Sequence, residues 1–132
     1  MKIVYKQNDI TFELNIHHRI CVLFNTSGDG KTFLFRSLQS SPEPLIDGDY
    51  IYINYLNYEN MIKRGELLGK ENDLIVFDNS DLYTEDLLKL VPKLKSTCII
   101  ITHTLMGYPA LGKFGFYKVK HTKDTVSMIM EN

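Results

Sequence analysis

One short stretch of this chain, residues 25–32, has the composition and spacing of a phosphate-binding loop. It follows the pattern G-x-x-x-x-G-K-[ST], except that an asparagine stands at the position of the first glycine. Asparagine tolerates a positive φ better than most residues, so we expect the sharp turn at this position to be kept. The residues assigned to phosphate binding are Asn25, Thr26, Ser27, Gly28, Asp29, Gly30, Lys31 and Thr32.

The chemistry of such a loop depends on its backbone as well as its side chains. Gly28 and Gly30 can adopt backbone angles that turn successive N–H groups toward an anion. A helix that begins directly after the loop adds the partial positive charge of its N-terminus. Lys31 would reach the β- and γ-phosphates, and the Thr32 hydroxyl would be a ligand of Mg²⁺. The alternative is a glycine-rich turn without a ligand, but the G-K-T sequence before a helix favours nucleotide binding.

An acidic residue, Asp78, ends the apolar run 74–78. An acid at the carboxyl end of a strand beside a phosphate loop can hold the Mg²⁺ shell. Asn79 occupies the next position, where a general base would be expected, and its amide cannot accept a proton. Asp81 is a candidate for that catalytic role through a different loop geometry. The alternative for Asp81, a solvated turn or helix-capping residue, is favoured by the capping preference of aspartate.

A histidine, His103, follows a third apolar run at 98–102. At the same edge of a sheet as Lys31 and Asp78, it could contact a γ-phosphate or a positioned water molecule. The alternative is an ordinary surface histidine at the end of a strand. The other three histidines, which have no comparable context, are predicted to be exposed turn residues: His17, His18 and His121.

The elements that must position these residues are visible as periodic patterns. Alternating residues predict a β-hairpin from segments 2–5 and 10–16. Further strands are expected at 20–24, 50–55, 74–78, 98–103, 114–120 and 125–130, and helices at 32–39, 60–68 and 84–94. Pro92 should kink the last helix or end it early. The alternation of buried strands and helices predicts an α/β fold of the P-loop NTPase type, with three layers, a mixed, mainly parallel central sheet and antiparallel edge strands.

The composition sets the broad class of the protein. A length of 132 residues predicts a single domain, 1–132. The formal net charge of −1 provides no basic field for nucleic acid. No apolar run is long enough for a membrane span, and the first residues lack the features of a signal peptide, so a cytoplasmic location is expected. Cys21 and Cys98 lie in apolar runs and are expected to be buried free thiols.

Taken together, the three short motifs resemble the ATP-binding-cassette type of P-loop ATPase. The resemblance covers most of the chain as a reduced core, including the antiparallel hairpin before the phosphate loop. It implies ATP and Mg²⁺ as cofactors, with Asp78 as the Walker B aspartate and His103 as the switch histidine. Family members stack an aromatic residue on adenine, and Tyr5 is the counterpart by position.

The chain also departs from that family in three ways. It contains no L-S-G-G-Q signature, it has no convincing glutamine loop in the region 55–70, and Asn79 stands where the catalytic glutamate belongs. The usual sandwich of two domains around ATP is therefore not expected. Without an activated water, hydrolysis should be slower by roughly 10²–10⁴-fold.

Three functions remain open at this point. The first is ATP binding by a minimal ATPase-like domain, with slow or partner-dependent hydrolysis acting as a switch for a protein partner or homodimer. The second is a non-catalytic protein-interaction module on a degenerate P-loop scaffold. Its motivation is the tyrosine-rich segment 50–58, for which packing is the simpler explanation. The third is a kinase or nucleotidyl-type transferase, for which the scattered Arg19, Arg36 and Arg64 give little support.

Overall fold

The protein forms an α/β fold around a single mixed sheet of eight strands, seen here in a computed structural model. The structure describes residues 1–24, 31–40, 48–63, 73–104 and 113–131. The order of the strands is β1-β2-β8-β7-β3-β6-β5-β4. The β1/β2 and β7/β8 pairs are antiparallel, and the other neighbouring pairs are parallel. The predicted mixed, mainly parallel sheet with an antiparallel edge is therefore confirmed.

Most elements lie where the periodic patterns predicted them. The strands are β1 (Lys2–Gln7), β2 (Ile10–Asn15), β3 (Ile20–Phe24), β4 (Tyr50–Ile53), β5 (Leu74–Phe77), β6 (Thr97–Thr102), β7 (Gly115–His121) and β8 (Thr125–Met130). The helices are α1 (Lys31–Gln39), α2 (Tyr58–Lys63) and α3 (Thr84–Leu90), with short 3₁₀ turns η1 (Ser80–Leu82) and η2 (Val91–Lys93).

Several strand bounds shift by one or two residues from the expectation, and two helices, α2 and α3, also differ from their predicted ranges. The α-helical part of α3 ends at Leu90 and continues as the 3₁₀ turn η2, which contains Pro92. Proline lacks the N–H that the helix needs and crowds the preceding turn, so the early end was correctly anticipated. Helix α2 begins at Tyr58, before its expected start at residue 60, and the end of the predicted helix falls outside the described residues.

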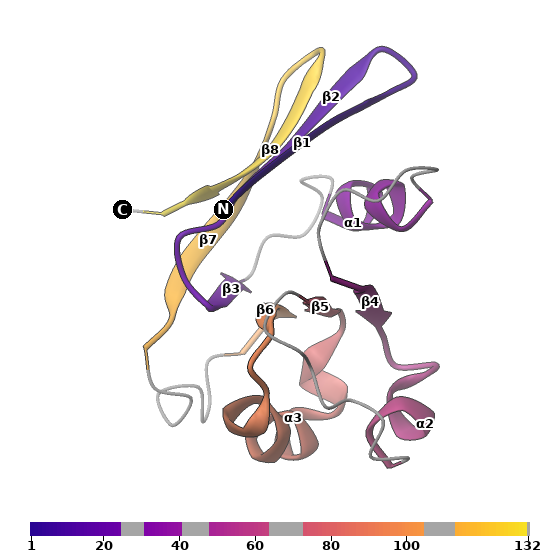
Figure 1. The fold of residues 1–132 in the computed structure, drawn as a ribbon, viewed down its shortest axis with the longest axis vertical. Helices are drawn as coiled ribbons and strands as arrows, with labels where there is room; N and C mark the ends of the chain where they lie inside the picture. The colour runs from indigo at the N-terminus through magenta and orange to yellow at the C-terminus, as the bar shows by residue number, and fades with distance from the viewer. Residues whose placement is uncertain (25–30, 41–47, 64–72, 105–112, 132) are drawn as a thin grey trace.

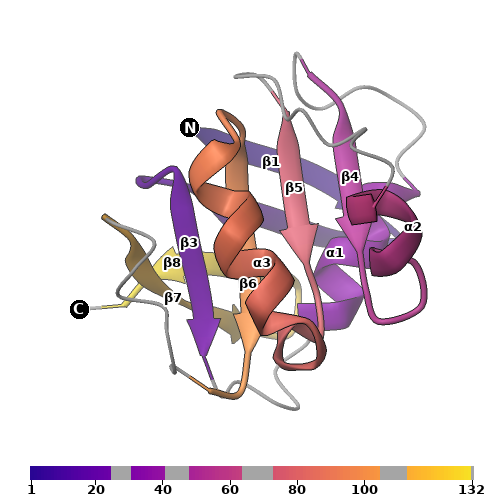
Figure 2. The same cartoon turned by 90° about the horizontal axis from the view of Figure 1, so that it is seen from below.

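The sheet curls, and this gives the molecule its layers. Figure 1 shows that β1, β2 and β8 bend over one side of the β3-β6-β5-β4 portion, with α1 enclosed between the two parts. Figure 2 shows α3 against the opposite face of the same strands. The β3-β6-β5-β4 portion is therefore covered on both faces, which explains its continuous apolar runs.

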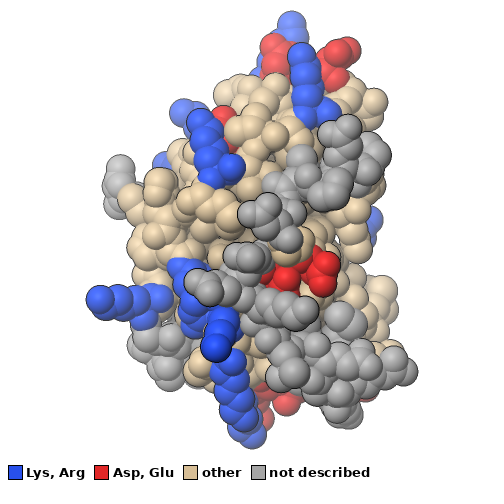
Figure 3. Space-filling model, in the orientation of Figure 1, with Lys and Arg blue, Asp and Glu red and all other residues tan. Residues whose placement is uncertain are grey.

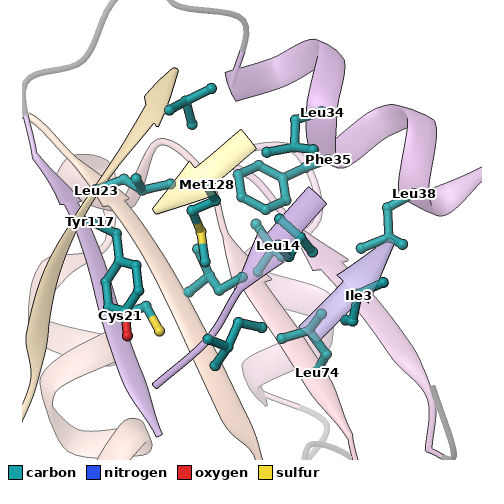
Figure 4. Packing of buried hydrophobic residues seen from close by; sticks show 14 of the residues in the cluster. Ile3, Leu14, Cys21, Leu23, Leu34, Phe35, Leu38, Leu74, Tyr117 and Met128 are labelled. Carbon is teal, nitrogen blue, oxygen red and sulfur yellow. The ribbon is translucent and has the colours of Figure 1, made fainter. Parts of the chain in front are cut away.

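Two hydrophobic cores correspond to the two covered faces. In the first, side chains of the hairpin, β3 and α1 meet, and Figure 4 shows Ile3, Leu14, Leu34, Phe35 and Leu38 among them. The second core joins the other faces of the same central strands to α3 and η2, through residues such as Leu87 and Val91. Because successive strand residues point to opposite faces, each central strand contributes to both cores.

The two cysteines belong to these cores. Cys21 and Cys98 are buried free thiols, as expected. Burial raises the pKa of the Cys21 thiol to about 12 and that of Cys98 to about 11, because the thiolate would lose its hydration. None of the described helices is both long enough and apolar enough to cross a membrane.

Candidate functional site

The strand and helix expected on either side of the phosphate loop are both present. Strand β3 ends at Phe24, and α1 begins at Lys31. Residues 25–30 lie outside the described part of the chain, as do the side chains of Lys31 and Thr32. The structure therefore supplies the frame of the predicted loop and leaves its binding role as a prediction.

The register of the parallel strands shows at which edge of the sheet β3 ends and α1 begins. Phe24 of β3 pairs with Thr102 of β6, Ile100 of β6 pairs with Phe77 of β5, and Phe77 pairs with Ile53 of β4. The carboxyl ends of β3, β6, β5 and β4 consequently lie at one edge. Asp78, Asp81 and His103 all follow strands that end there, so the structure brings these three predicted residues to the same edge of the sheet.

Asp78 is buried at this edge and is held on both oxygens. Its Oδ2 accepts a short hydrogen bond from the Tyr52 hydroxyl, and its Oδ1 accepts one from the backbone N–H of Asn79 at 2.9 Å. Tyr52 belongs to the hydrophobic core that contains α1, whereas Phe77, the residue before Asp78, belongs to the core that contains α3. The Asp78 carboxylate thus lies on the α1 side of the sheet. A carboxylate has about four acceptor positions, so capacity remains for a metal-bound water.

Tyr52 links this carboxylate to helix α1. Burial and the neighbouring Asp78 carboxylate raise the pKa of Tyr52 far above its ordinary value, while the Arg36 guanidinium acts in the opposite direction. Tyr52 was not singled out as a site residue from the sequence. The available signal was the alternation in β4, where Ile51 and Ile53 pack on the α3 side and leave Tyr50 and Tyr52 facing α1.

Helix α1 is fixed by two further tyrosines. The Tyr5 hydroxyl donates to the carbonyl of Leu34 at 2.8 Å, and the Tyr50 hydroxyl donates to that of Phe35 at 2.9 Å. The Tyr5 ring also stacks on Phe12, with ring centroids 4.9 Å apart and an interplanar angle of 12°. Phe12 therefore covers one face of the ring that the family resemblance assigned to adenine.

Asp81 connects the turn after β5 to the end of β6. Its Oδ1 accepts from the Thr102 hydroxyl at 2.7 Å, and the backbone N–H of His103 donates to Oδ1 at 2.9 Å and to Oδ2 at 3.0 Å. Neither η1 nor α3 has a side-chain cap, so the helix-capping interpretation of Asp81 was wrong. The carboxylate is occupied by donors from another strand, which makes it a positioning group for His103.

The remainder of this turn is also constrained by non-local bonds. Asn79 adopts a left-handed conformation with φ of 52°, which asparagine tolerates. The buried Ser80 hydroxyl donates to the carbonyl of Ile101 at 2.8 Å, and the Tyr83 hydroxyl donates to the carbonyl of Asp78. His103 itself is exposed, with its side chain free of the core. The segment after β5 therefore contacts both the Asp78 backbone and strand β6, and these contacts fix the positions of Asp78 and His103.

The structure corrects the interpretation of one other histidine. His17 and His121 are exposed, as predicted, but His18 is half-buried. Its Nδ1 lies 2.8 Å from the Tyr117 hydroxyl, and the two rings meet edge to face. The pairing became possible because β7 lies beside β3, which local sequence patterns do not reveal.

The carboxylates described at the candidate site are single residues on separate contacts, Asp78 with Tyr52 and Asp81 with Thr102. Among the described residues, no group of three or more His, Cys, Asp or Glu could hold a metal ion. Nucleotide-bound Mg²⁺ does not need such a group, since it uses one or two protein oxygens together with phosphates and water.

No protein-family model matches this chain, and no curated protein sequence is significantly similar to it.

We expect Asp81→Ala to lower the free energy of unfolding by about 1–3 kcal/mol, because it removes the acceptor of the Thr102 hydroxyl and the His103 N–H. Urea unfolding followed by circular dichroism would measure the change. Glu131→Ala, at an exposed position after β8, is the matched control and should change stability by less than about 0.5 kcal/mol. Equal stability of the two variants would contradict the positioning role of Asp81.

Proposed function

We propose that this chain binds a nucleoside triphosphate with Mg²⁺ at the carboxyl edge of its central sheet, as a minimal domain of the P-loop NTPase type. The observation that carries the proposal is the position of Asp78 relative to α1. Its carboxylate lies on the α1 face and bonds Tyr52, which Arg36 of α1 approaches. Helix α1 begins at Lys31, and the buried carboxylate lies on the same face of the sheet. A helix N-terminus for phosphate and an acid for the Mg²⁺ shell are two of the features by which phosphate-loop proteins hold Mg²⁺ and a nucleotide.

The topology supports the same proposal. Strand β3 leads toward the motif, the chain then passes through α1 to the distant strand β4, and it returns through β5 and β6 to a place beside β3. Ligands of open α/β sheets bind outside the carboxyl ends of strands at such a reversal of strand order. Lys31 and the loop amides would hold the phosphates, Thr32 and Asp78 the Mg²⁺ shell, and His103 would sense the γ-phosphate.

Catalytic turnover in this proposal is slow. Asn79 cannot act as a base, and the carboxylate oxygens of Asp81 are engaged by Thr102 and His103. Hydrolysis then depends on a residue from a partner, and the nucleotide acts chiefly as a switch. Because Asp81 binds the His103 N–H, a change at the γ-phosphate would be transmitted to the turn after β5.

A non-catalytic interaction module is the second candidate. Most described tyrosines of segment 50–58 are used in packing: Tyr50 and Tyr52 contact α1 or Asp78, and Tyr58 stacks on Tyr83. The observation in favour of a partner surface is instead a set of exposed apolar side chains near the same edge: Tyr55, Leu56 and Leu82. A partner retained equally with and without nucleotide would favour this candidate.

Calorimetric titration with Mg²⁺-ATP tests the proposal directly. We expect saturable one-to-one binding by the wild-type protein and a loss of about tenfold to a hundredfold in Lys31→Ala, the typical value of a charge-assisted hydrogen bond. Lys89→Ala, on the exposed surface of α3, is the matched control and should bind like the wild type. A folded wild-type protein that binds neither ATP, ADP nor GTP would overturn the proposal.

A further inference from the structure

A groove of about 560 Å³ opens at the amino edge of the sheet, where β3 and β6 begin. It is lined by Met1, Ile16, His17, His18, Arg19, Lys95 and Thr97. Small-molecule sites commonly have volumes of roughly 300–1,000 Å³. Strand β3 has five residues and separates this groove from the proposed nucleotide edge by about 17 Å at 3.3 Å per residue. The groove is therefore a separate feature of the molecule.

The lining of the groove is cationic. Arg19 and Lys95 are both exposed on it, and the lining contains no Asp or Glu. In the described part of the chain, the ion pair that forms is Lys2–Glu13 at 3.2 Å, which leaves both groove cations without a carboxylate partner. Figure 3 shows Lys and Arg side chains gathered at the lower left of the molecule, around the position where β3 begins in Figure 1.

The Arg19 guanidinium is held in place by backbone groups. Its Nη1 donates to the carbonyl of Leu94 at 3.0 Å and to that of Ser96 at 3.2 Å. These two carbonyls flank Lys95, which also lines the groove. A guanidinium has five N–H donors in a planar fork, so donors remain for a bidentate oxyanion.

His18 is fixed as a third polar group of the groove. Its Nδ1 is 2.8 Å from the Tyr117 hydroxyl, which also accepts from the His17 N–H at 2.8 Å. The ring lies against Gly115, where a Cβ would come within 2.4 Å of Nδ1. With Nδ1 occupied, Nε2 is the ring nitrogen left for a ligand. Ile16 and Met1 add apolar lining beside these donors.

We propose that this groove binds a small organic anion, with its oxyanion head group on Arg19, Lys95 and His18 and its apolar part against Ile16 and Met1. A phosphate monoester and a carboxylate present the same oxyanion chemistry to an arginine fork. The groove is larger than an inorganic anion, and its apolar residues would contact the organic part of the ligand.

Titrations followed by ¹H–¹⁵N NMR test this inference with three probes: phenyl phosphate, benzoate and neutral benzyl alcohol. We expect saturable shifts at residues 16–19 and 95–97 with at least one anion, at a Kd of about 1 mM for a ligand of this size. Tighter binding of phenyl phosphate would identify a phosphate ester as the ligand type, and tighter binding of benzoate a carboxylate.

The variants separate this groove from the phosphate loop. Lys95→Gln should weaken anion binding about tenfold, whereas Lys93→Gln, an exposed neighbour outside the lining, should not change it. Lys31→Ala should also leave these shifts unchanged, so a failed nucleotide proposal does not affect the result. The inference is overturned if neither anion saturates, if benzyl alcohol binds equally well, or if Lys95→Gln binds like the wild type.

Discussion

Replacement of Asp78 by asparagine is expected to lower the affinity for Mg²⁺-ATP by about tenfold to a hundredfold and to remove most of the Mg²⁺ dependence of binding. The buried carboxylate is the proposed acidic member of the Mg²⁺ shell, and Mg²⁺ strongly prefers charged oxygen ligands. Calorimetric titration of ATP with Mg²⁺ and with excess EDTA would measure the effect. The wild-type protein should lose affinity when Mg²⁺ is removed, whereas Asp78→Asn should show similar affinities in both conditions.

A second variant distinguishes metal binding from support of the fold. Tyr52→Phe removes the hydrogen bond to Asp78 Oδ2 and keeps the carboxylate. It should cost about 1 kcal/mol of stability and preserve the Mg²⁺ dependence. If Tyr52→Phe abolished the Mg²⁺ dependence of ATP binding as fully as Asp78→Asn, the Tyr52–Asp78 pair would support the fold and would not bind the metal. Full Mg²⁺ dependence in Asp78→Asn would exclude Asp78 from the metal shell.

Alkaline pH is expected to destabilise the fold, on the order of a few kcal/mol between pH 9 and pH 11. Burial raises the pKa of Cys21 to about 12, of Cys98 to about 11 and of Tyr117 to about 12, from ordinary values of 9.0 for cysteine and 10.0 for tyrosine. The pKa values of Tyr50 and Tyr52 are raised further, with burial as the main cause.

The sign of this effect follows from proton binding. Above pH 9 the unfolded chain releases protons that the folded protein still holds, so unfolding becomes more favourable as the pH rises. The contribution of these groups to stability is complete below pH 9 and is lost as the pH rises through 11–12. Each group changes the free energy of unfolding by at most about 1.4 kcal/mol per pH unit.

Urea unfolding at pH 8, 9, 10 and 11 in the presence of a reductant would measure this dependence. Tyr50→Phe removes one of the raised groups and should make the decline with pH shallower, although it also loses the bond to the Phe35 carbonyl. Stability that stays constant from pH 8 to pH 11 would show that the buried hydroxyls and thiols do not titrate as their burial requires.

Local patterns were sufficient for most of the elements. The alternation in β2 and the apolar runs of β3, β5 and β6 are properties of short segments, because side-chain direction in a strand repeats every two residues. Pro92 ends the α-helical part of α3 because it lacks the backbone N–H that a further helical turn would need. The motif at 25–32 likewise carries its chemical prediction in eight adjacent residues, independently of the rest of the chain.

The roles of individual site residues required the tertiary structure. The local sequence predicts a catalytic or capping role for Asp81, whereas its partners on β6 are 21 and 22 positions away in sequence. Tyr52 meets Asp78 across 26 positions, and His18 meets Tyr117 across 99. These contacts depend on which strands are neighbours and in what register, and strand pairing between distant segments leaves no periodic signal in either segment.

The sequence by itself therefore determined the α/β class and the strand and helix on either side of residues 25–30, and it carries the prediction of which residues would hold Mg²⁺ and phosphate. Tertiary structure alone decided that Asp78 is buried against Tyr52 on the α1 face, that Asp81 positions His103, and that Arg19, Lys95 and His18 share a groove at the opposite edge. The physical reason is that propensity and periodicity act within a segment, whereas burial, charge pairing and hydrogen bonding between side chains depend on the order in which the sheet assembles its strands.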